Sequence, residues 1–136
     1  MIIRRGNKKD IKELVKINLT AKKDTGWWIP QNASFYRKFI RNKNNSIYVA
    51  FEKDNLVGFL GLEFNKERKS TWINDIYVLR EFRRNKIAKK LVQIAVKDWK
   101  SKSKSMVLLT ADRNLSIFEN LGFKKTMNFM EFERLK

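Results

Sequence analysis

The 136-residue sequence contains no cysteine and no histidine. Without cysteine the chain has no thiol nucleophile, no disulfide and no thiolate ligand for a metal ion. Without histidine it lacks the commonest general base and the commonest metal-binding side chain. Any catalysis must therefore use carboxylates, tyrosine, serine, threonine, lysine, arginine, backbone amides or bound water. No motif in the sequence supports a metal site, and we expect none.

Long apolar runs are also missing, and the chain has five glycines and one proline. The first residues form neither a signal peptide nor a membrane span, because no apolar run is long enough. The length suits one domain, and 43% hydrophobic residues, with 12% aromatic residues, are enough for a packed core. We expect a single soluble domain over residues 1–136, located in the cytoplasm and without a membrane partner.

Negative charge is scarce. Lysine and arginine number 31 against 14 acidic residues, which gives a formal net charge of +17. The basic residues occur in short clusters along the whole chain, which is typical of a solvated surface. The same charge attracts polyanions, so nucleic acid is the alternative partner. The sequence has no basic helix, zinc finger or aromatic–basic RNA motif.

Hydrophobic periodicity and turn residues predict one mixed α/β domain around a single sheet. Asp10 is a candidate N-cap for the first helix, and residues 20–31 read as irregular. The predicted strands are residues 1–5, 46–51, 55–64, 70–78, 106–111 and 127–135. Four helices are predicted. The first follows Asp10, and the second begins at Asn32 or Ser34. The third covers residues 86–100, and the fourth covers residues 112–121 and ends at a left-handed Gly122. The predicted order is βααβββαβαβ.

The strand over residues 70–78 departs from strict alternation between Ile73 and Ile76. One extra residue there would restore the pattern, which is typical of a β-bulge. A bulge bends a strand away from its neighbour and leaves free backbone groups. A strand assigned one residue too long is the alternative explanation.

The strand that ends at Val78 runs into a basic turn and then into an amphipathic helix. Free amides at a helix N-terminus, with arginines beside them, favour a phosphate or pyrophosphate. The alternative is an ordinary solvated loop.

Two stretches and the opening of the chain resemble the GNAT acetyltransferases. The basic turn is similar to the family's pyrophosphate motif Arg/Gln-x-x-Gly-x-Gly/Ala, through Arg83-Arg84-Asn85-Lys86-Ile87-Ala88. Near the C-terminus, the family pattern Phe-Tyr-Glu-Lys-x-Gly-Phe is matched by Ile117-Phe118-Glu119-Asn120-Leu121-Gly122-Phe123. The resemblance covers nearly the whole chain in the right order. It implies a mostly antiparallel sheet with splayed central strands, flanked by helices.

The resemblance also implies an N-acetyltransferase that binds acetyl-CoA between the splayed strands. The acceptor amine attacks the thioester directly, so neither cysteine nor histidine is needed. By this resemblance, the pantetheine arm is expected to hydrogen-bond to the backbone groups of Ile76, Tyr77 and Val78. The pyrophosphate is expected to bind the amides of the turn, which consists of Arg83, Arg84, Asn85, Lys86, Ile87 and Ala88. Asn114 and Phe118 complete the cofactor-binding set.

Two positions depart from the family pattern. The first loop glycine falls at Lys86, which we expect not to reproduce glycine's dihedral angles, although its ammonium adds a charge for a phosphate. Asn85 tolerates left-handed geometry and is expected to close the turn instead. The tyrosine that often protonates the leaving thiolate falls at Phe118, which has no proton to give, so turnover should be slower. The asparagine that often precedes it falls at Ala111, and Asn114 is the candidate substitute.

Candidates for deprotonating the acceptor amine are two carboxylates, Asp75 beside the bulge and Glu63 on the neighbouring strand. Each is alternatively a surface carboxylate paired with a nearby base. Three tyrosines could replace the missing general acid as proton donors, namely Tyr77, Tyr48 and Tyr36. The alternative for each is packing in the core or at the surface. Trp27 and Trp28 lie where the family forms its acceptor site, and either contact substrate or fold onto the core.

Two functions follow. The first is an acetyl-CoA-dependent N-acetyltransferase acting on a small-molecule, peptide or RNA-linked amine, as a monomer or homodimer. The alternative is a catalytically weakened GNAT-fold module that binds nucleic acid or another acidic partner. Lys86, Phe118 and the charge of +17 favour the alternative. The charge also argues against a highly cationic acceptor.

Overall fold

A computed structural model describes residues 1–110, 114–128 and 130. Within these residues, five strands and four α-helices follow the first nine elements of the predicted order, with two short 3₁₀ helices. The strands are β1 (Ile2–Arg5), β2 (Asn45–Glu52), β3 (Asn55–Asn65), β4 (Ser70–Val78) and β5 (Ser105–Val107). The helices are η1 (Lys8–Asp10), α1 (Ile11–Thr25), α2 (Ala33–Arg41), η2 (Arg80–Asn85), α3 (Ile87–Trp99) and α4 (Leu115–Asn120).

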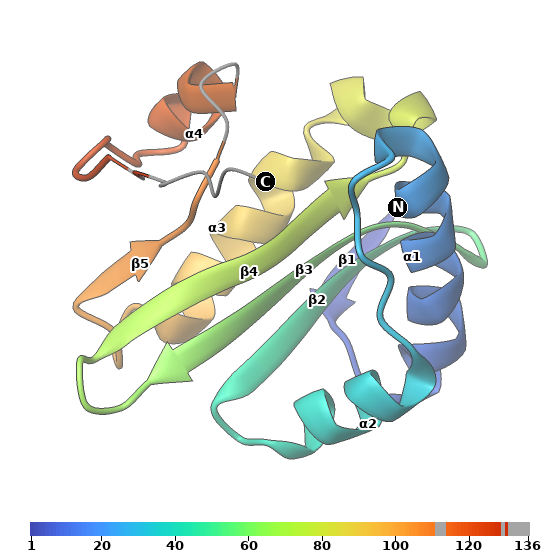
Figure 1. Cartoon of the computed structure of the whole chain (residues 1–136), viewed down its shortest axis with the longest axis horizontal. Coiled ribbons are helices and arrows are strands. Elements are labelled where there is room, and N and C mark those ends of the chain that lie inside the picture. The colour runs from blue at the N-terminus through green and yellow to red at the C-terminus, as the bar shows by residue number, and fades with distance from the viewer. Residues whose placement is uncertain (111–113, 129, 131–136) are drawn as a thin grey trace, which may run out of the picture.

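The strands form one sheet in the order β1-β2-β3-β4-β5. All neighbours are antiparallel except β4 and β5, which run parallel. This last pairing covers only Ser70↔Ser105, Thr71↔Met106 and Trp72↔Val107. Figure 1 shows β5 beside the first part of β4, with the chain then turning away toward α4. The predicted mixed, mostly antiparallel sheet with splayed central strands is confirmed.

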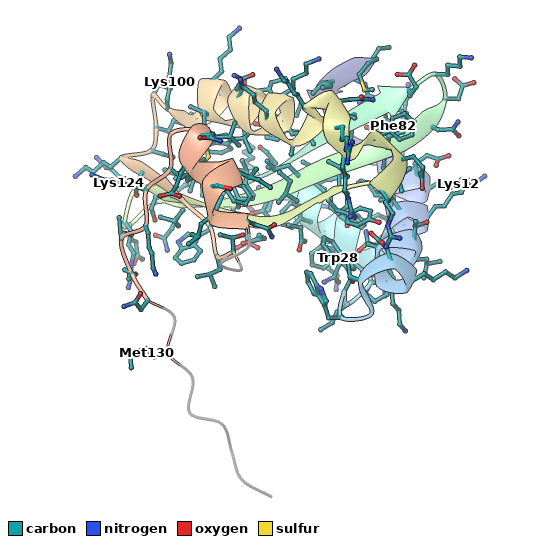
Figure 2. The ribbon with its side chains drawn as sticks, turned by 90° about the horizontal axis from the view of Figure 1, so that it is seen from above. Lys12, Trp28, Phe82, Lys100, Lys124 and Met130 are labelled. Carbon is teal, nitrogen blue, oxygen red and sulfur yellow. The ribbon has the colours of Figure 1, made fainter. Side chains whose placement is uncertain are left out.

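Helices cover both faces of the sheet. One apolar cluster joins α1 and α2 to β2, β3 and β4 through residues such as Leu14, Phe39 and Phe59. A second cluster joins α3 to the opposite face through residues such as Leu60 and Leu91. Figure 2 shows Trp28 and α1 on one side of the sheet and α3 on the other. The two cores hold the sheet between them.

The first helix begins where predicted, with Asp10 at its N-cap position, but it ends later than predicted. Asp10 makes no capping hydrogen bond to α1; its carboxylate accepts from Arg4 and from the backbone N–H of Asn7. The Asn7 side chain caps η1 instead. The helix runs to Thr25, where left-handed Gly26 ends it, so much of the stretch predicted to be irregular is helical. Apolar contacts of Ala21 with the core favour these extra turns.

The C-terminal elements are shorter than predicted. The sixth strand is wrong for residues 127, 128 and 130, which are not in a strand, and residues 129 and 131–135 lie outside the described residues. The strand predicted to reach Ala111 ends at Val107, and Ala111 itself lies outside the described residues. The last helix covers Leu115–Asn120, while positions 112 and 113 are also outside them. Gly122 follows with a positive φ of 100°, as predicted.

The longest helix, α1, has 15 residues. A helix needs about 20 apolar residues to cross a bilayer. None of the helices in the described part of the chain has the length and apolar character that a crossing requires.

Candidate active site

A bulge in β4 sets the geometry of the site. Leu62 of β3 pairs with Ile73, but Gly61 pairs with Asp75, so Asn74 is the extra residue. Because of this insertion, Ile73 and Ile76 both pack toward the α3 core although they are three residues apart. The predicted bulge is confirmed at the predicted place. It lies just beyond Trp72, the last residue of β4 that pairs with β5.

Beyond the bulge, β4 has a free edge toward β5. The N–H of Leu79 donates to the Val57 carbonyl of β3 at 2.8 Å. Since backbone groups alternate along a strand, Tyr77 turns its peptide groups to β3, and Ile76 and Val78 turn theirs away. The Val78 carbonyl accepts from Arg83 Nε at 2.9 Å. The Val78 N–H and both peptide groups of Ile76 have no partner among the described residues.

The turn after β4 is compact. Residues Arg80–Asn85 form η2, and Lys86 connects it to α3 with φ 59° and ψ 28°. Lys86 therefore adopts the left-handed geometry, and the expectation that Asn85 would do so is wrong. The Lys90 N–H closes the first turn of α3 on the Lys86 carbonyl. The N–H groups of residues 87–89 precede that bond, so they have no partner within the helix.

Asp24 lies in the last turn of α1 and connects the turn after β4 to the sheet. Its carboxylate accepts from the Tyr77 hydroxyl at 2.9 Å and pairs with Arg80 and Arg83. The Tyr77 hydrogen bond, aided by Arg83 and Arg80, lowers the pKa of Asp24. Burial and the bond to Asp24 raise the pKa of Tyr77 to about 12, which keeps its hydroxyl protonated. Sequence reasoning missed Asp24, because its partners are more than 50 residues away.

Asp75 and Glu63 line one pocket of about 280 Å³ under α2. They share it with amide side chains and apolar residues, namely Gln31, Asn74, Phe35, Tyr36, Phe39, Ile47, Phe59 and Gly61. Burial, with repulsion from Glu63, raises the pKa of Asp75. A Cβ at Gly61 would meet no atom within 4 Å, so the missing side chain leaves the pocket open. The structure thus brings together the two carboxylates singled out as candidate bases.

Buried Asn18 holds the wall of this pocket. Its Nδ2 donates to the Leu14 carbonyl and to the Tyr36 hydroxyl, at 2.8 and 2.7 Å. Its Oδ1 accepts from Trp28 Nε1 and from the Gln31 N–H, at 2.9 and 3.1 Å. One side chain therefore positions α1, the connecting loop and α2. The signal for it was an amide on the apolar face of a predicted helix.

The remaining candidates occupy different surroundings. Trp28 is 8% exposed, packs on Phe59 and Tyr77, and does not line the pocket, whereas Trp27 is 66% exposed. The core-packing alternative therefore describes Trp28. Tyr36 lines the pocket, and burial raises its pKa to about 12.

Tyr48 and α4 lie elsewhere. Tyr48 donates to Asp98 and accepts from Trp99 behind the sheet, away from the acid pocket. Phe118 of α4 is buried against Phe123, with the ring centroids 6.0 Å apart. Asn114 precedes α4 and makes no side-chain capping bond. Within the described ranges, no three acidic side chains gather into a metal-binding group.

Solved structures share this arrangement. An aminoglycoside acetyltransferase from an uncultured soil metagenomic sample, solved with sisomicin, is 15% identical (TM-score 0.80), covering 99% of this chain and 96% of its own. Glucosamine-6-phosphate N-acetyltransferase from Arabidopsis thaliana is 20% identical (TM-score 0.78), with 97% of each chain covered. An acetyltransferase from Trypanosoma brucei is 16% identical (TM-score 0.78), covering 98% and 99%. These likenesses establish the fold.

Sequence comparison gives the family. A search of curated proteins finds no matching sequence. The model of the acetyltransferase (GNAT) family matches residues 11–123, which is well over half of the chain. Together with the splayed sheet, this match shows that the chain belongs to the GNAT acetyltransferase family of enzymes.

Proposed function

We propose that this protein is an acetyl-CoA-dependent N-acetyltransferase whose acceptor amine binds in the pocket of Asp75 and Glu63. The observation that carries the proposal is the position of the bulge. Asn74 and Asp75 line the acid pocket, and at the same place β4 loses its pairing with β5. An acceptor on one face and a thioester along the free edge would therefore meet at the bulge.

The free edge and the turn fit a coenzyme A arm. The peptide groups of Ile76 and the Val78 N–H offer unpaired hydrogen-bonding groups to the pantetheine amides. The N–H groups of residues 87–89, which have no partner within α3, lie at the start of that helix, where the helix dipole favours a pyrophosphate. Arg84 and Lys86 add positive charge, whereas Arg83 holds the turn through Asp24. When bound, acetyl-CoA supplies the activated acetyl group.

The pocket fits a small amine. Its volume of about 280 Å³ is equivalent to roughly nine water molecules. Two carboxylates attract an ammonium group, and the rings of Phe35 and Phe39 accommodate an apolar body. This supports a compact primary amine rather than a large polycationic acceptor.

The raised pKa of Asp75 suits a general base, because a base works best when its pKa lies nearer the operating pH. Asp75 takes the proton from the amine, whose nitrogen then forms the C–N bond as the C–S bond breaks. The departing thiolate takes its proton from water, since Phe118 has none to give. Tyr36, protonated and in the same pocket, orients the acceptor through its hydroxyl oxygen.

The test combines binding and turnover. Acetyl-CoA at millimolar concentration should raise the melting temperature, because a ligand that binds only the folded state stabilises it. A panel of primary amines, with release of free thiol as the readout, should then reveal turnover. Absence of any thermal shift with acetyl-CoA or CoA would refute the proposal and leave the non-catalytic binding module.

A second variant tests the acceptor site. Gly61→Val should fill the pocket and raise the acceptor KM, with little change in the KM for acetyl-CoA. The control is Gly58→Ala, because a Cβ at Gly58 would crowd the Tyr77 carbonyl at 3.2 Å and lower stability instead. An unchanged acceptor KM in Gly61→Val would place the acceptor elsewhere.

A further inference from the structure

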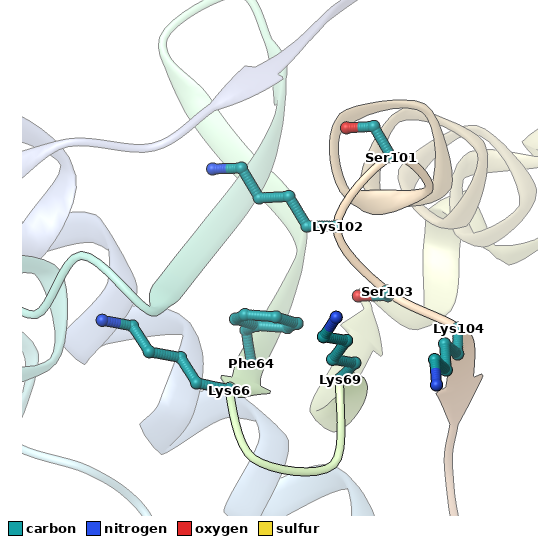
Figure 3. Close-up of a pocket in the computed structure, with 7 residues that line it drawn as sticks. All are labelled: Phe64, Lys66, Lys69, Ser101, Lys102, Ser103 and Lys104. Atoms are coloured by element: carbon teal, nitrogen blue, oxygen red, sulfur yellow. The ribbon is translucent and has the colours of Figure 1, made fainter.

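A basic hollow lies at the far end of β4 from the cofactor turn. It measures about 550 Å³ and is lined by Phe64, Lys66, Lys69, Ser101, Lys102, Ser103 and Lys104. Figure 3 shows these side chains around the ring of Phe64. Since β4 has nine residues at about 3.3 Å each, the hollow and the turn are separated by about 26 Å. Two distinct sites therefore occupy the two ends of one strand.

Two loops build the hollow and are fastened together. The Lys104 N–H donates to the Lys69 carbonyl at 2.6 Å, and the hydroxyls of Thr71 and Ser103 are hydrogen-bonded to each other. Lys69 has a positive φ of 51°, which turns the β3–β4 connection toward the second loop. These contacts fix the two loops against each other, so four exposed lysines extend from neighbouring positions around the hollow.

The charges in the hollow are not neutralised by the protein. In the part of the chain that the structure describes, the ion pairs involve Met1, Arg4, Arg80 and Arg83, and none involves these four lysines. The one acid within segments 66–69 and 100–104 is Glu67, which does not line the hollow. Four ammonium groups around one hollow repel one another, so a multivalent anion relieves the repulsion.

An aromatic ring lies among these charges. Phe64 is half-buried, and its ring centroid lies 5.3 Å from that of Trp99. Lys102 places its ammonium 5.2 Å from the centroid of Trp99. Lysines with an aromatic face are the combination that binds nucleotides, because phosphates pair with the cations and a base stacks on the ring.

We propose that this hollow binds the phosphates and base of a nucleotide, carried either by a free nucleoside polyphosphate or by single-stranded RNA. Lys66 and Lys69 contact phosphate from one side, Lys102 and Lys104 from the other, and Phe64 stacks on the base. This site is separate from the acyl-transfer site and does not rest on the function proposed above.

The test compares two variants with the same charge change. The first replaces the four hollow lysines (Lys66→Gln, Lys69→Gln, Lys102→Gln and Lys104→Gln). The matched control replaces four exposed lysines of η1 and α1 (Lys8→Gln, Lys9→Gln, Lys12→Gln and Lys23→Gln). The probes are adenosine triphosphate and a fluorescent oligouridylate of about 12 nucleotides. Both lysine variants keep the cofactor turn intact, so any nucleotide bound at that turn contributes equally to all three proteins and cannot cause a difference between them.

The wild type and the control should bind with similar affinity, and the hollow variant should bind at least tenfold more weakly. Each lost phosphate contact lowers the salt dependence of single-strand binding by about 0.7, so the slope should fall by up to about 2.8. Phe64→Leu keeps an apolar side chain and should weaken nucleotide binding but not pyrophosphate binding. Loss of oligouridylate binding alone assigns RNA as the source, and loss of triphosphate binding assigns a free nucleotide.

Three results would overturn the proposal: no binding by the wild type, an equal loss in both lysine variants, or unchanged binding in the hollow variant. Melting temperatures of both variants check that they fold. Acetyl transfer by the hollow variant should match the wild type, so a failure of this site is distinguishable from a failure of the enzyme.

Discussion

The Tyr77 hydroxyl donates to the Asp24 carboxylate at 2.9 Å, which joins the end of the bent strand to the end of the first helix. Through Asp24 the same contact reaches Arg80 and Arg83, so α1 controls the position of the turn before α3. The turn proposed to bind the cofactor is therefore held by a carboxylate that itself lies outside it.

Replacing Asp24 by Asn should raise the KM for acetyl-CoA several-fold with little change in kcat. The substitution removes the negative charge that holds two arginines, so the turn loses its anchor. Steady-state kinetics measure this, and Glu81→Gln, in the same turn, is the control. A lower KM would mean that Arg83, once released, binds phosphate better than the anchored turn does.

Replacing Asp75 by Asn should lower kcat by about 10²–10⁴-fold, the usual contribution of a general base. It should also stabilise the protein at neutral pH. The pKa of Asp75 is raised in the folded state, so its stabilising effect is complete below about pH 4 and is lost as the pH rises through the folded value. Urea unfolding at pH 4 and pH 7 should show the larger gain at pH 7. A variant less stable than the wild type at pH 7 contradicts this.

Replacing Glu63 by Gln should move the acidic limb of the pH profile of kcat/KM to lower pH. Repulsion from Glu63 helps to raise the pKa of Asp75, so its removal lowers that pKa. Glu67→Gln, on the same hairpin, should leave the profile in place. An unmoved limb in Glu63→Gln would show that another group is the base.

Replacing Lys86 by Gly should stabilise the fold. A left-handed conformation costs a residue with a side chain about 1–2 kcal/mol and costs glycine little, so the melting temperature should rise by about 4 °C. Lys89→Gly makes the same chemical change within helix α3 and should cost about 1 kcal/mol. Equal effects of the two substitutions would show that φ at Lys86 carries no strain.

Replacing Phe118 by Tyr should raise kcat by about tenfold or more, if only the missing proton donor limits departure of the thiolate. The substitution keeps the ring packed on Phe123 and adds one hydroxyl. Single-turnover rates at several pH values give the measurement, and Phe123→Tyr is the control. Unchanged transfer would show that Phe118 is not a missing acid.

The sequence was sufficient to predict the first five strands in their order and the bulge, but it wrongly predicted a strand at residues 127, 128 and 130. Strands and helices carry local periodicity, and the spacing of Ile73 and Ile76 reveals the inserted residue without any knowledge of the fold. The ordered motifs then predicted the family. The end of α1 was misjudged because tertiary packing, here of Ala21, extends a helix beyond its local signal.

The candidate site was predictable only in part. Asp75 and Glu63 stood out as carboxylates on neighbouring strands. The role of Asp24 depends on partners brought by folding, so no local pattern marks it. Asn18 had a local signal, its place on the apolar face of a predicted helix, but its partners Trp28, Gln31 and Tyr36 could not be read from the sequence. Left-handed Lys86 was missed because lysine rarely adopts that conformation, and its neighbours impose it here.

The inserted Asn74 bends β4, but it does not decide on which face of the sheet the neighbouring side chains lie. Deleting Asn74 would place Asp75 directly after Ile73, and the two side chains would still point to opposite faces, because neighbours in a regular strand do so. Asp75, Tyr77 and Ile76 would all keep their surroundings while the bend disappeared. A one-residue deletion can therefore remove the opening of the sheet at the loss of one pocket side chain, that of Asn74, while the other side chains of β4 keep their faces.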